Sequence, residues 1–205
     1  MIKKQDLQII IKIQDACIRL LTDRLSPLIF AYSVALSDID IEKEISPNIQ
    51  DIVQDLYKEF EPDDLYFFDN DLDIHDYYNK IIPDELLKNR ITHYIKNIAP
   101  LLALEPYFGR NRYWDTDNFF LEHIDQFSKN YLAGLLDNNA LLASLKEQYG
   151  YWHGEISEET DLVVLYVMQR LELIPFLYDN ELQRQEEAKK EVTNLLGYIS
   201  SMQKK

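Results

Sequence analysis

The sequence has few glycines and prolines, the residues that end helices and strands, and only one cysteine. Only five Gly and seven Pro occur among 205 residues, whereas a sheet-rich fold needs a turn about every 8–12 residues. Cys17 is the single cysteine, so no disulfide can form within the chain. A reducing compartment is the simpler expectation for such a sequence. These shortages favour helices over sheets.

Long apolar runs are missing as well. No stretch approaches the roughly 20 apolar residues that a membrane-spanning helix needs. The opening stretch, MIKKQDLQIIIKIQDACIRLL, is broken by polar side chains and lacks the continuous apolar core of a signal peptide. We therefore expect a cytoplasmic protein without a membrane partner.

The sequence also lacks catalytic signatures. It has no Gly-rich phosphate loop and no G-x-S-x-G elbow. Its four histidines do not pair at metal-ligand spacing, and no second cysteine can assist them. Cys17 lies on an apolar helical stripe, which predicts a small buried hydrophobe rather than a nucleophile. We therefore expect no enzyme, no cofactor and no dedicated metal site.

Negative charge, in contrast, is abundant. The net charge is −15, and residues 38–80 alone carry fourteen acidic and three basic side chains, a net charge of −11. Such a field repels nucleic acids and anionic membranes and attracts cationic surfaces. The expected partner is therefore a basic protein rather than nucleic acid. Solubility alone is the other explanation of the charge.

Helical periodicity dominates the remaining pattern. Apolar residues recur at three- and four-residue spacing, as on one face of an amphipathic helix. The stretch DLVVLYVMQRLEL, residues 161–173, is apolar nearly all round, which favours a buried central helix; its valines make a strand the alternative. The sequence predicts an all-α fold, a single compact domain of six to eight helices over residues 1–205, with no sizeable sheet.

Several details of these helices are specific enough to test. The pair Ser46-Pro47 and, later, Ser157 are typical of helix starts, and Thr116 or Asp117 is expected to cap the helix that follows them in the sequence. Gly150 is expected just beyond a short helix that follows an interruption at residues 137–139. Three inward faces are predicted: Ile10, Ile13, Cys17, Leu20 and Leu21; Phe120, Ile124, Phe127, Tyr131 and Leu135; and Leu182, Val192, Leu196 and Ile199.

Residues 59–80, EFEPDDLYFFDNDLDIHDYYNK, form an acidic segment with eight acidic side chains, six aromatic rings and one basic residue. A solvated loop has no need of so many rings. Aromatic anchors among carboxylates suit the capture of a cationic partner, because charge steers the encounter and desolvated rings supply contact. The alternative is that the rings pack inward and the acids only solvate the exterior. The predicted partner-binding residues are Asp63, Asp64, Tyr66, Asp69, Asp71, Asp73, Asp76, Tyr77 and Tyr78.

The same segment resembles a calcium loop only in part. Asp69, Asp71 and Asp73 match positions 1, 3 and 5 of such a loop. The loop also needs Gly at position 6 and a bidentate Glu at position 12, where this chain has Ile74 and Lys80. The match fails at its two most selective positions, so no calcium site is predicted.

These features predict a small acidic protein-binding module, most concretely an immunity protein or inhibitor that occludes a basic toxin or nuclease. One alternative is a metal-dependent enzyme that uses acidic and histidine side chains at residues 115–123 and 153–159. Another is a structural subunit or scaffold, and a homo-oligomer stays open as well. The side chains of the enzyme alternative are Asp115, Asp117, Glu122, His123, His153, Glu155 and Glu159.

Overall fold

The computed structural model describes most of the first helix, isolated positions in the middle of the chain, and the carboxyl-terminal region: residues 4–22, 24, 46–47, 50–51, 89, 91–93, 96 and 115–203. All regular structure in these residues is helical. The all-α class predicted from the shortage of Gly and Pro is therefore confirmed. The chain divides into two compact units, one of Met1–Ile11 with Leu104–Lys205 and one of Lys12–Ala103. The expectation of a single domain over residues 1–205 stays a prediction.

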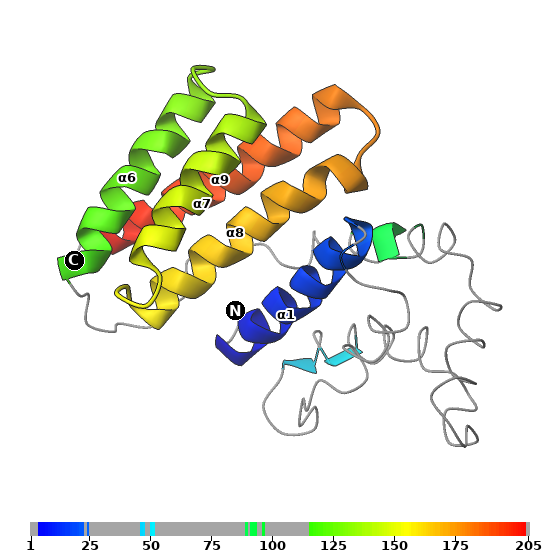
Figure 1. Cartoon of the computed structure of the whole chain (residues 1–205), viewed down its shortest axis with the longest axis horizontal. Helices are drawn as coiled ribbons and strands as arrows, with labels where there is room; N and C mark the ends of the chain where they lie inside the picture. The colour runs from blue at the N-terminus through cyan, green and yellow to red at the C-terminus, as the bar shows by residue number, and fades with distance from the viewer. Residues whose placement is uncertain are drawn as a thin grey trace. The chain divides into compact units, whose positions relative to one another are not determined.

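The carboxyl-terminal region folds into a bundle of α6 (Asp115–Leu132), α7 (Asn138–Trp152), α8 (Glu158–Leu177) and α9 (Glu181–Gln203). In Figure 1, α6 packs against α7 and α9, and α8 packs against the same two helices. Short loops turn the chain back after each helix, which gives the up-down-up-down order of a four-helix bundle. Among the described helices, none is both long enough and apolar enough to cross a membrane.

α8 is buried on all sides. Val163, Val164 and Val167 are 0% exposed, and a helix that is apolar all round has to be covered all round. The helix predicted over residues 161–173 is confirmed, because burial between neighbouring helices outweighs the modest strand preference of valine. The predicted start is confirmed as well: the Oγ of Ser157 accepts a hydrogen bond from the N–H of Thr160 at 3.4 Å.

α9 buries one stripe of side chains. The predictions for Val192 and Ile199 are confirmed, since both are fully buried. The prediction for Leu182 is wrong, because at about 100° per residue it lies roughly 240° around the helix from buried Ala188, and it is 64% exposed. Leu196 is only half-buried, and its neighbour Leu195 takes the inward position instead.

A glycine fixes the end of α6. Gly134 has a φ of +76°, a conformation that glycine adopts at little cost. Its N–H donates to the carbonyl of Tyr131, and the N–H of Leu135 donates to that of Asn130, both at 2.9 Å. This pairing is the Schellman motif, so Leu135 lies beyond the helix and is 73% exposed. The prediction that Leu135 continues the inward face is wrong. The other predicted members are buried or half-buried: Phe120, Ile124, Phe127 and Tyr131.

The start of α6 also differs from the prediction. The helix begins at Asp115, so Thr116 and Asp117 lie in its first turn rather than at its cap. Asp117 is instead fully buried, and its Oδ1 accepts a hydrogen bond from the N–H of Ser157 at 2.8 Å. A residue that could cap its own helix here satisfies the backbone next to another helix.

α7 starts earlier and ends later than predicted, since it begins at Asn138, inside the expected interruption at residues 137–139, and continues to Trp152. Asp137 is the N-cap, with its Oδ1 accepting from the N–H of Ala140 at 2.8 Å, so the interruption lies at residues 133–137. The helix continues through Gly150, and Gly154, with a φ of +91°, follows its end instead. A glycine inside a helix costs only about 1 kcal/mol relative to alanine, which the packing of α7 outweighs.

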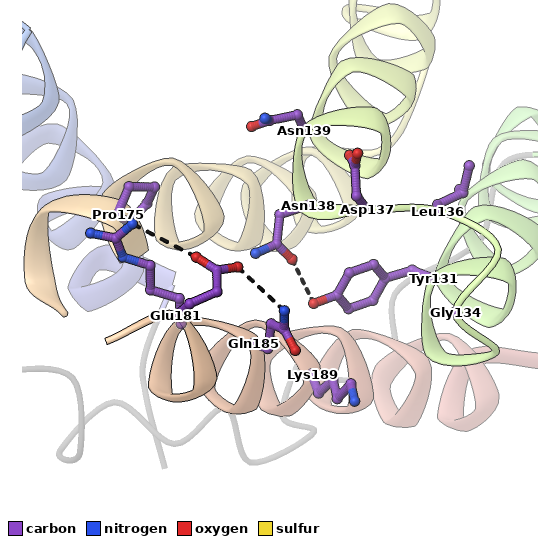
Figure 2. A pocket seen from close by; sticks show the side chains of 11 residues that line it. Tyr131, Gly134, Leu136, Asp137, Asn138, Asn139, Pro175, Glu181, Gln185 and Lys189 are labelled. Carbon is purple, nitrogen blue, oxygen red and sulfur yellow. Dashed lines mark hydrogen bonds and ion pairs between the residues drawn. The ribbon is translucent and has the colours of Figure 1, made fainter. Parts of the chain in front are cut away.

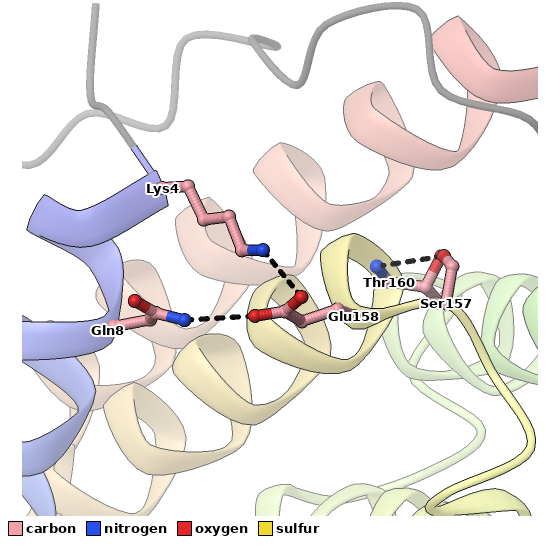
Figure 3. Close-up of polar contacts among 5 residues, drawn as sticks. All are labelled: Lys4, Gln8, Ser157, Glu158 and Thr160. Carbon is pink, nitrogen blue, oxygen red and sulfur yellow. Dashed lines mark hydrogen bonds and ion pairs between the residues drawn. The ribbon is translucent and has the colours of Figure 1, made fainter.

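α1 spans Lys4–Leu21. Its residues up to Ile11 belong to the unit that contains the bundle. There Lys4 forms an ion pair with Glu158, and the side-chain amide of Gln8 donates to the same carboxylate at 3.0 Å, as Figure 3 shows. These bonds join the first turns of α1 to the start of α8. On its predicted inward face, the following residues are buried and Ile13 is half-buried: Ile10, Cys17, Leu20 and Leu21.

The described residues of the other unit agree with the sequence. Cys17 is 1% exposed, and burial, with a smaller effect of the Asp15 charge, raises the pKa of its thiol to about 12. The prediction of a buried hydrophobe at Cys17 is confirmed. Pro47 is helical and the N–H of Gln50 donates to the carbonyl of Ser46 at 3.0 Å, so the predicted helix start is confirmed too.

Candidate functional site

The acidic segment, residues 59–80, lies outside the described residues. Its role in partner binding therefore stays a prediction. The same holds for every predicted partner-binding residue: Asp63, Asp64, Tyr66, Asp69, Asp71, Asp73, Asp76, Tyr77 and Tyr78.

The structure brings together the two regions of the predicted acid and histidine cluster. The Oγ1 of Thr116, in the first turn of α6, donates to the carbonyl of Glu155 at 2.7 Å. The buried carboxylate of Asp117 accepts from the N–H of Ser157. These bonds are made largely to backbone groups, so they fix the loop before α8 rather than gather carboxylates around a shared point.

The histidines of this region make separate contacts. The Nδ1 of His123 donates to the carbonyl of Phe119 in its own helix at 2.8 Å, and the Nδ1 of His153 donates to Asp161 Oδ1 at 3.0 Å. Within residues 4–203, as far as the structure describes them, no three His, Cys, Asp or Glu side chains are grouped so that they could hold a metal ion. The metal-dependent enzyme stays a prediction that these contacts do not support.

Sequence reasoning missed the role of Asp161, which the fold places beside His153 and Tyr149. Burial, and next the charge of Asp161 and a hydrogen bond to it, raise the pKa of the Tyr149 hydroxyl. The rings of Tyr149 and His153 lie 5.1 Å apart, centroid to centroid. The group connects the end of α7 to the start of α8. A short loop between helix ends is the sequence signal that could have indicated it.

A cavity of about 580 Å³ opens at the other end of the bundle, where the loop from α6 to α7 meets the start of α9 (Figure 2). A volume of this size is within the range of roughly 300–1,000 Å³ that is usual for small-ligand sites. Most of its lining residues are polar, whereas apolar residues predominate in a typical ligand pocket. The polar side chains that line it are Tyr131, Asp137, Asn138, Asn139, Glu181, Arg184, Gln185 and Lys189.

Hydrogen bonds hold part of this wall in place. The hydroxyl of Tyr131 donates to Asn138 Oδ1 at 2.6 Å, which fixes the orientation of that amide. The Nδ2 of Asn138 is therefore directed away from the Tyr131 hydroxyl, as Figure 2 shows. Burial and then the nearby charge of Glu181 raise the pKa of the Tyr131 hydroxyl, so this donor stays protonated.

The charged side chains of the cavity all come from the start of α9, apart from Asp137. The Nε of Arg184 donates to the carbonyl of Tyr178 at 2.6 Å. Within the part of the chain that the structure describes, Glu181 has only long contacts, at 3.3 Å to Gln185 Nε2 and 3.8 Å to Arg184. Lys189 is exposed, and its ammonium has no partner among the described residues. Glu181 and Lys189 are thus the two charges of this wall that are least committed to the fold.

The cations of the bundle are largely neutralised by carboxylates. Lys189 is the exception within residues 115–203. The pairs and their N–O distances are Lys129–Asp125 at 2.6 Å, Lys146–Glu172 at 2.7 Å, Arg170–Glu191 at 3.3 Å, Lys190–Glu187 at 3.6 Å and Arg184–Glu181 at 3.8 Å.

Many carboxylates are left over because acidic residues outnumber basic ones. Several are exposed and have no cationic partner within the part of the chain that the structure describes. They are spread over α6, α7, α9 and two loops. They are Glu122, Glu147, Glu155, Asp179 and Glu186.

Large apolar side chains are exposed at both ends of the bundle. Phe119 and Tyr151 lie towards the end where α6 starts and α7 finishes. Leu135 and Leu182 are exposed as well, and in the sequence they directly follow Gly134 and Glu181, which line the cavity. Aromatic side chains such as Phe119 and Tyr151 are enriched in protein–protein interfaces, whereas acidic side chains are depleted there and the rim is polar.

Comparisons with known proteins identify no family for this chain. No family model matches the chain, and neither the curated proteins nor the solved structures include a match to it.

Proposed function

We propose that this chain is an acidic protein-binding module whose partner is a positively charged protein. The observation that supports the proposal is that nearly all basic side chains of the bundle are paired, whereas several of its acidic side chains are not. Its cations other than Lys189 lie within 4.0 Å of carboxylates, whereas acids such as Glu122, Glu147 and Glu186 have no cationic partner among the described residues. Internal pairing therefore leaves the bundle a negative exterior.

Such a field acts mainly on the rate of encounter. Long-range attraction raises association rate constants from about 10⁵–10⁶ to about 10⁸ M⁻¹ s⁻¹ or more at low salt. Residues 59–80, with a further excess of acids among aromatic rings, would then supply the desolvated anchors that carry most of the affinity. The mechanism is occlusion of the partner's own basic site.

The most concrete form of this module is an immunity protein or inhibitor of a basic toxin or nuclease. A nuclease needs a cationic surface to hold its anionic substrate, and an acidic protein competes for that surface. The proposal includes a cytoplasmic location, in line with the single cysteine, and excludes nucleic acid as the partner because of its charge.

The direct test is capture of partners from the producing cells by the full chain at low salt, followed by elution with rising salt. We expect a basic protein that elutes between about 0.1 and 0.5 M salt, where screening removes steering between surfaces. A purified partner should then associate more slowly with the Glu122→Lys, Glu147→Lys, Glu186→Lys triple variant than with the wild type.

The matched control is the same triple variant with Gln in place of Lys, which removes charge without reversing it. Its association rate should lie between those of the wild type and the Lys variant. Retention that is equal at 50 mM and 500 mM salt, or capture of nucleic acid instead of protein, would contradict the proposal.

A further inference from the structure

Polar side chains of α9 line the cavity at the loop end of the bundle. Glu181, Gln185 and Lys189 all line it, and they are spaced four residues apart on α9. Each step of four residues turns the helix by only about 40°, so the three side chains lie along one broad stripe of its surface. Along the axis of α9 the lining side chains therefore follow the order acid, amide, base. Figure 2 shows Glu181 and Gln185 on the side of α9 that faces Asn138, with Lys189 further along the helix.

The two charged ends of this row are well separated. Eight residues of α-helix rise about 12 Å, so Glu181 and Lys189 are too far apart to pair directly with each other. A ligand that satisfies both must carry a positive and a negative group at its two ends, about 10 Å apart. Three residues of extended peptide span about that length, with an ammonium at one end and a carboxylate at the other.

The remaining wall suits the middle of such a ligand. Asn138 and Asn139, in the first turn of α7, line the cavity together with Gln185 of α9. A side-chain amide offers both a donor and an acceptor, as a peptide group requires. The bond from Tyr131 to Asn138 Oδ1 leaves the two N–H donors of that amide for a carbonyl in the cavity.

The charges at the two ends are held more loosely than the other charges of the wall. Among the described residues, Lys189 has no partner, and Glu181 makes only long contacts, at 3.3 Å to Gln185 and at 3.8 Å to Arg184, whose charge it partly balances. Arg184 is held by its bond of 2.6 Å to the Tyr178 carbonyl. Binding at the two ends would therefore displace little that stabilises the fold.

We propose that this cavity binds a free peptide of about three residues, with its terminal ammonium at Glu181 and its terminal carboxylate at Lys189. Recognition depends on both termini and on the peptide groups between them, and the side chains of the ligand matter less. A protein chain end, which offers only one of the two charges, does not satisfy the site.

The test uses the full chain, with trialanine as the probe and nitrogen-edited NMR spectra as the readout. We expect saturable shifts of the amide signals at residues 134–139 and 181–189. Acetylation of the peptide's amino end or amidation of its carboxyl end should each weaken binding about tenfold or more, the value of one charge-assisted hydrogen bond. Single alanine and hexaalanine should bind more weakly than trialanine, because neither spans the two charges.

Two variants assign the ends. Glu181→Gln should bind trialanine and acetyl-trialanine equally, while it still discriminates against the amidated peptide. Lys189→Met should show the reverse pattern. A change of specificity of this kind does not follow from loss of folding.

The matched controls are Glu186→Gln and Lys190→Met, which alter the same charges on α9 at positions that do not line the cavity. Both should keep the affinity and the discrimination of the wild type. The proposal is overturned if trialanine causes no saturable shift at 10 mM, if capped peptides bind as well as the free peptide, or if either cavity variant keeps both discriminations.

Discussion

Arg170 and Glu191 form an ion pair inside the bundle, with 3.3 Å between Arg170 Nε and Glu191 Oε1 and side chains that are only 2% and 8% exposed. The pair joins α8 to α9. Its field reaches Tyr166, where burial and the charge of Glu191 raise the pKa of the hydroxyl and the charge of Arg170 opposes them. Because both side chains are buried, water cannot replace the partner of either charge.

Removal of one member should therefore cost more than removal of both. We expect Glu191→Ala to lower the free energy of unfolding by about 3–5 kcal/mol, because it leaves a buried guanidinium without its carboxylate. The double variant Arg170→Met, Glu191→Leu should lose much less, since apolar groups of similar volume carry no desolvation cost. Urea denaturation of the full chain measures both. Equal losses in the single and the double variant would show that the pair contributes through shape rather than charge.

Two glycines should respond in opposite directions to the same change. Gly134→Ala should destabilise the protein by about 1–2 kcal/mol, because alanine at a φ of +76° is strained. Gly197 lies within α9, where an added Cβ would meet nothing within 4 Å. Gly197→Ala should therefore stabilise the protein by about 0.5–1 kcal/mol. Thermal and urea unfolding check the pair, and a shift of the same sign in both would contradict the assignment of Gly134 as the end of α6.

The burial of Cys17 predicts both its reactivity and a pH effect. The native thiol should react with a thiol reagent at pH 8 far more slowly than the thiol of the urea-unfolded chain, because its pKa is raised to about 12. The unfolded thiol loses its proton near its ordinary pKa of 9.0, while the folded one keeps it up to about 12. Stability should therefore fall as pH rises between these values, by up to about 1.4 kcal/mol per pH unit from this group.

The variant Cys17→Ala isolates that effect. Tyrosines such as Tyr149 and Tyr166 also have raised pKa values, so the wild type alone cannot assign the slope. The variant should be less stable at pH 7, because a buried side chain is shortened, and its stability should fall less steeply above pH 9. Parallel slopes in the two proteins would mean that Cys17 ionises as easily in the folded state as in the unfolded state.

The sequence predicted the helices better than their ends. The burial of Val163 and Val192 follows from periodicity, because a helix places residues on faces at fixed angles. The exposure of Leu135 does not follow from periodicity, because Gly134 ends α6 one turn earlier than the pattern indicates. The exposure of Leu182 depends on which face of α9 turns inward, which the pattern leaves ambiguous. Gly134 is a local signal for the end of α6, but the apolar spacing that runs through Leu135 favours a longer helix.

The cavity was beyond reach from the sequence for a different reason. Glu181 and Lys189 read as ordinary solvated charges of an amphipathic helix, and Asn138 as part of a break between helices. Only the up-down order of the bundle brings the start of α7 opposite the start of α9. Contacts between elements far apart in sequence leave no periodic trace, whereas the charge excess of residues 59–80 is visible in composition alone.

The last prediction concerns the acidic segment directly. Reversal of Asp69, Asp71 and Asp73 to Lys should weaken binding of the basic partner, mainly through a slower association rate, because steering depends on net charge near the contact. The loss should be larger at 50 mM than at 500 mM salt, since salt screens the interaction in the wild type as well. Stopped-flow mixing with the purified partner separates the association from the dissociation rate.

The control for this variant is Tyr77→Ala with Tyr78→Ala, which keeps the charge of the segment and removes two candidate anchors. It should speed dissociation and leave the salt dependence of association unchanged. If the charge-reversed variant instead binds as the wild type does at both salt concentrations, residues 59–80 are not the binding site. The steering would then come from the unpaired carboxylates of the bundle, such as Glu122 and Glu147, whose reversal provides the comparison.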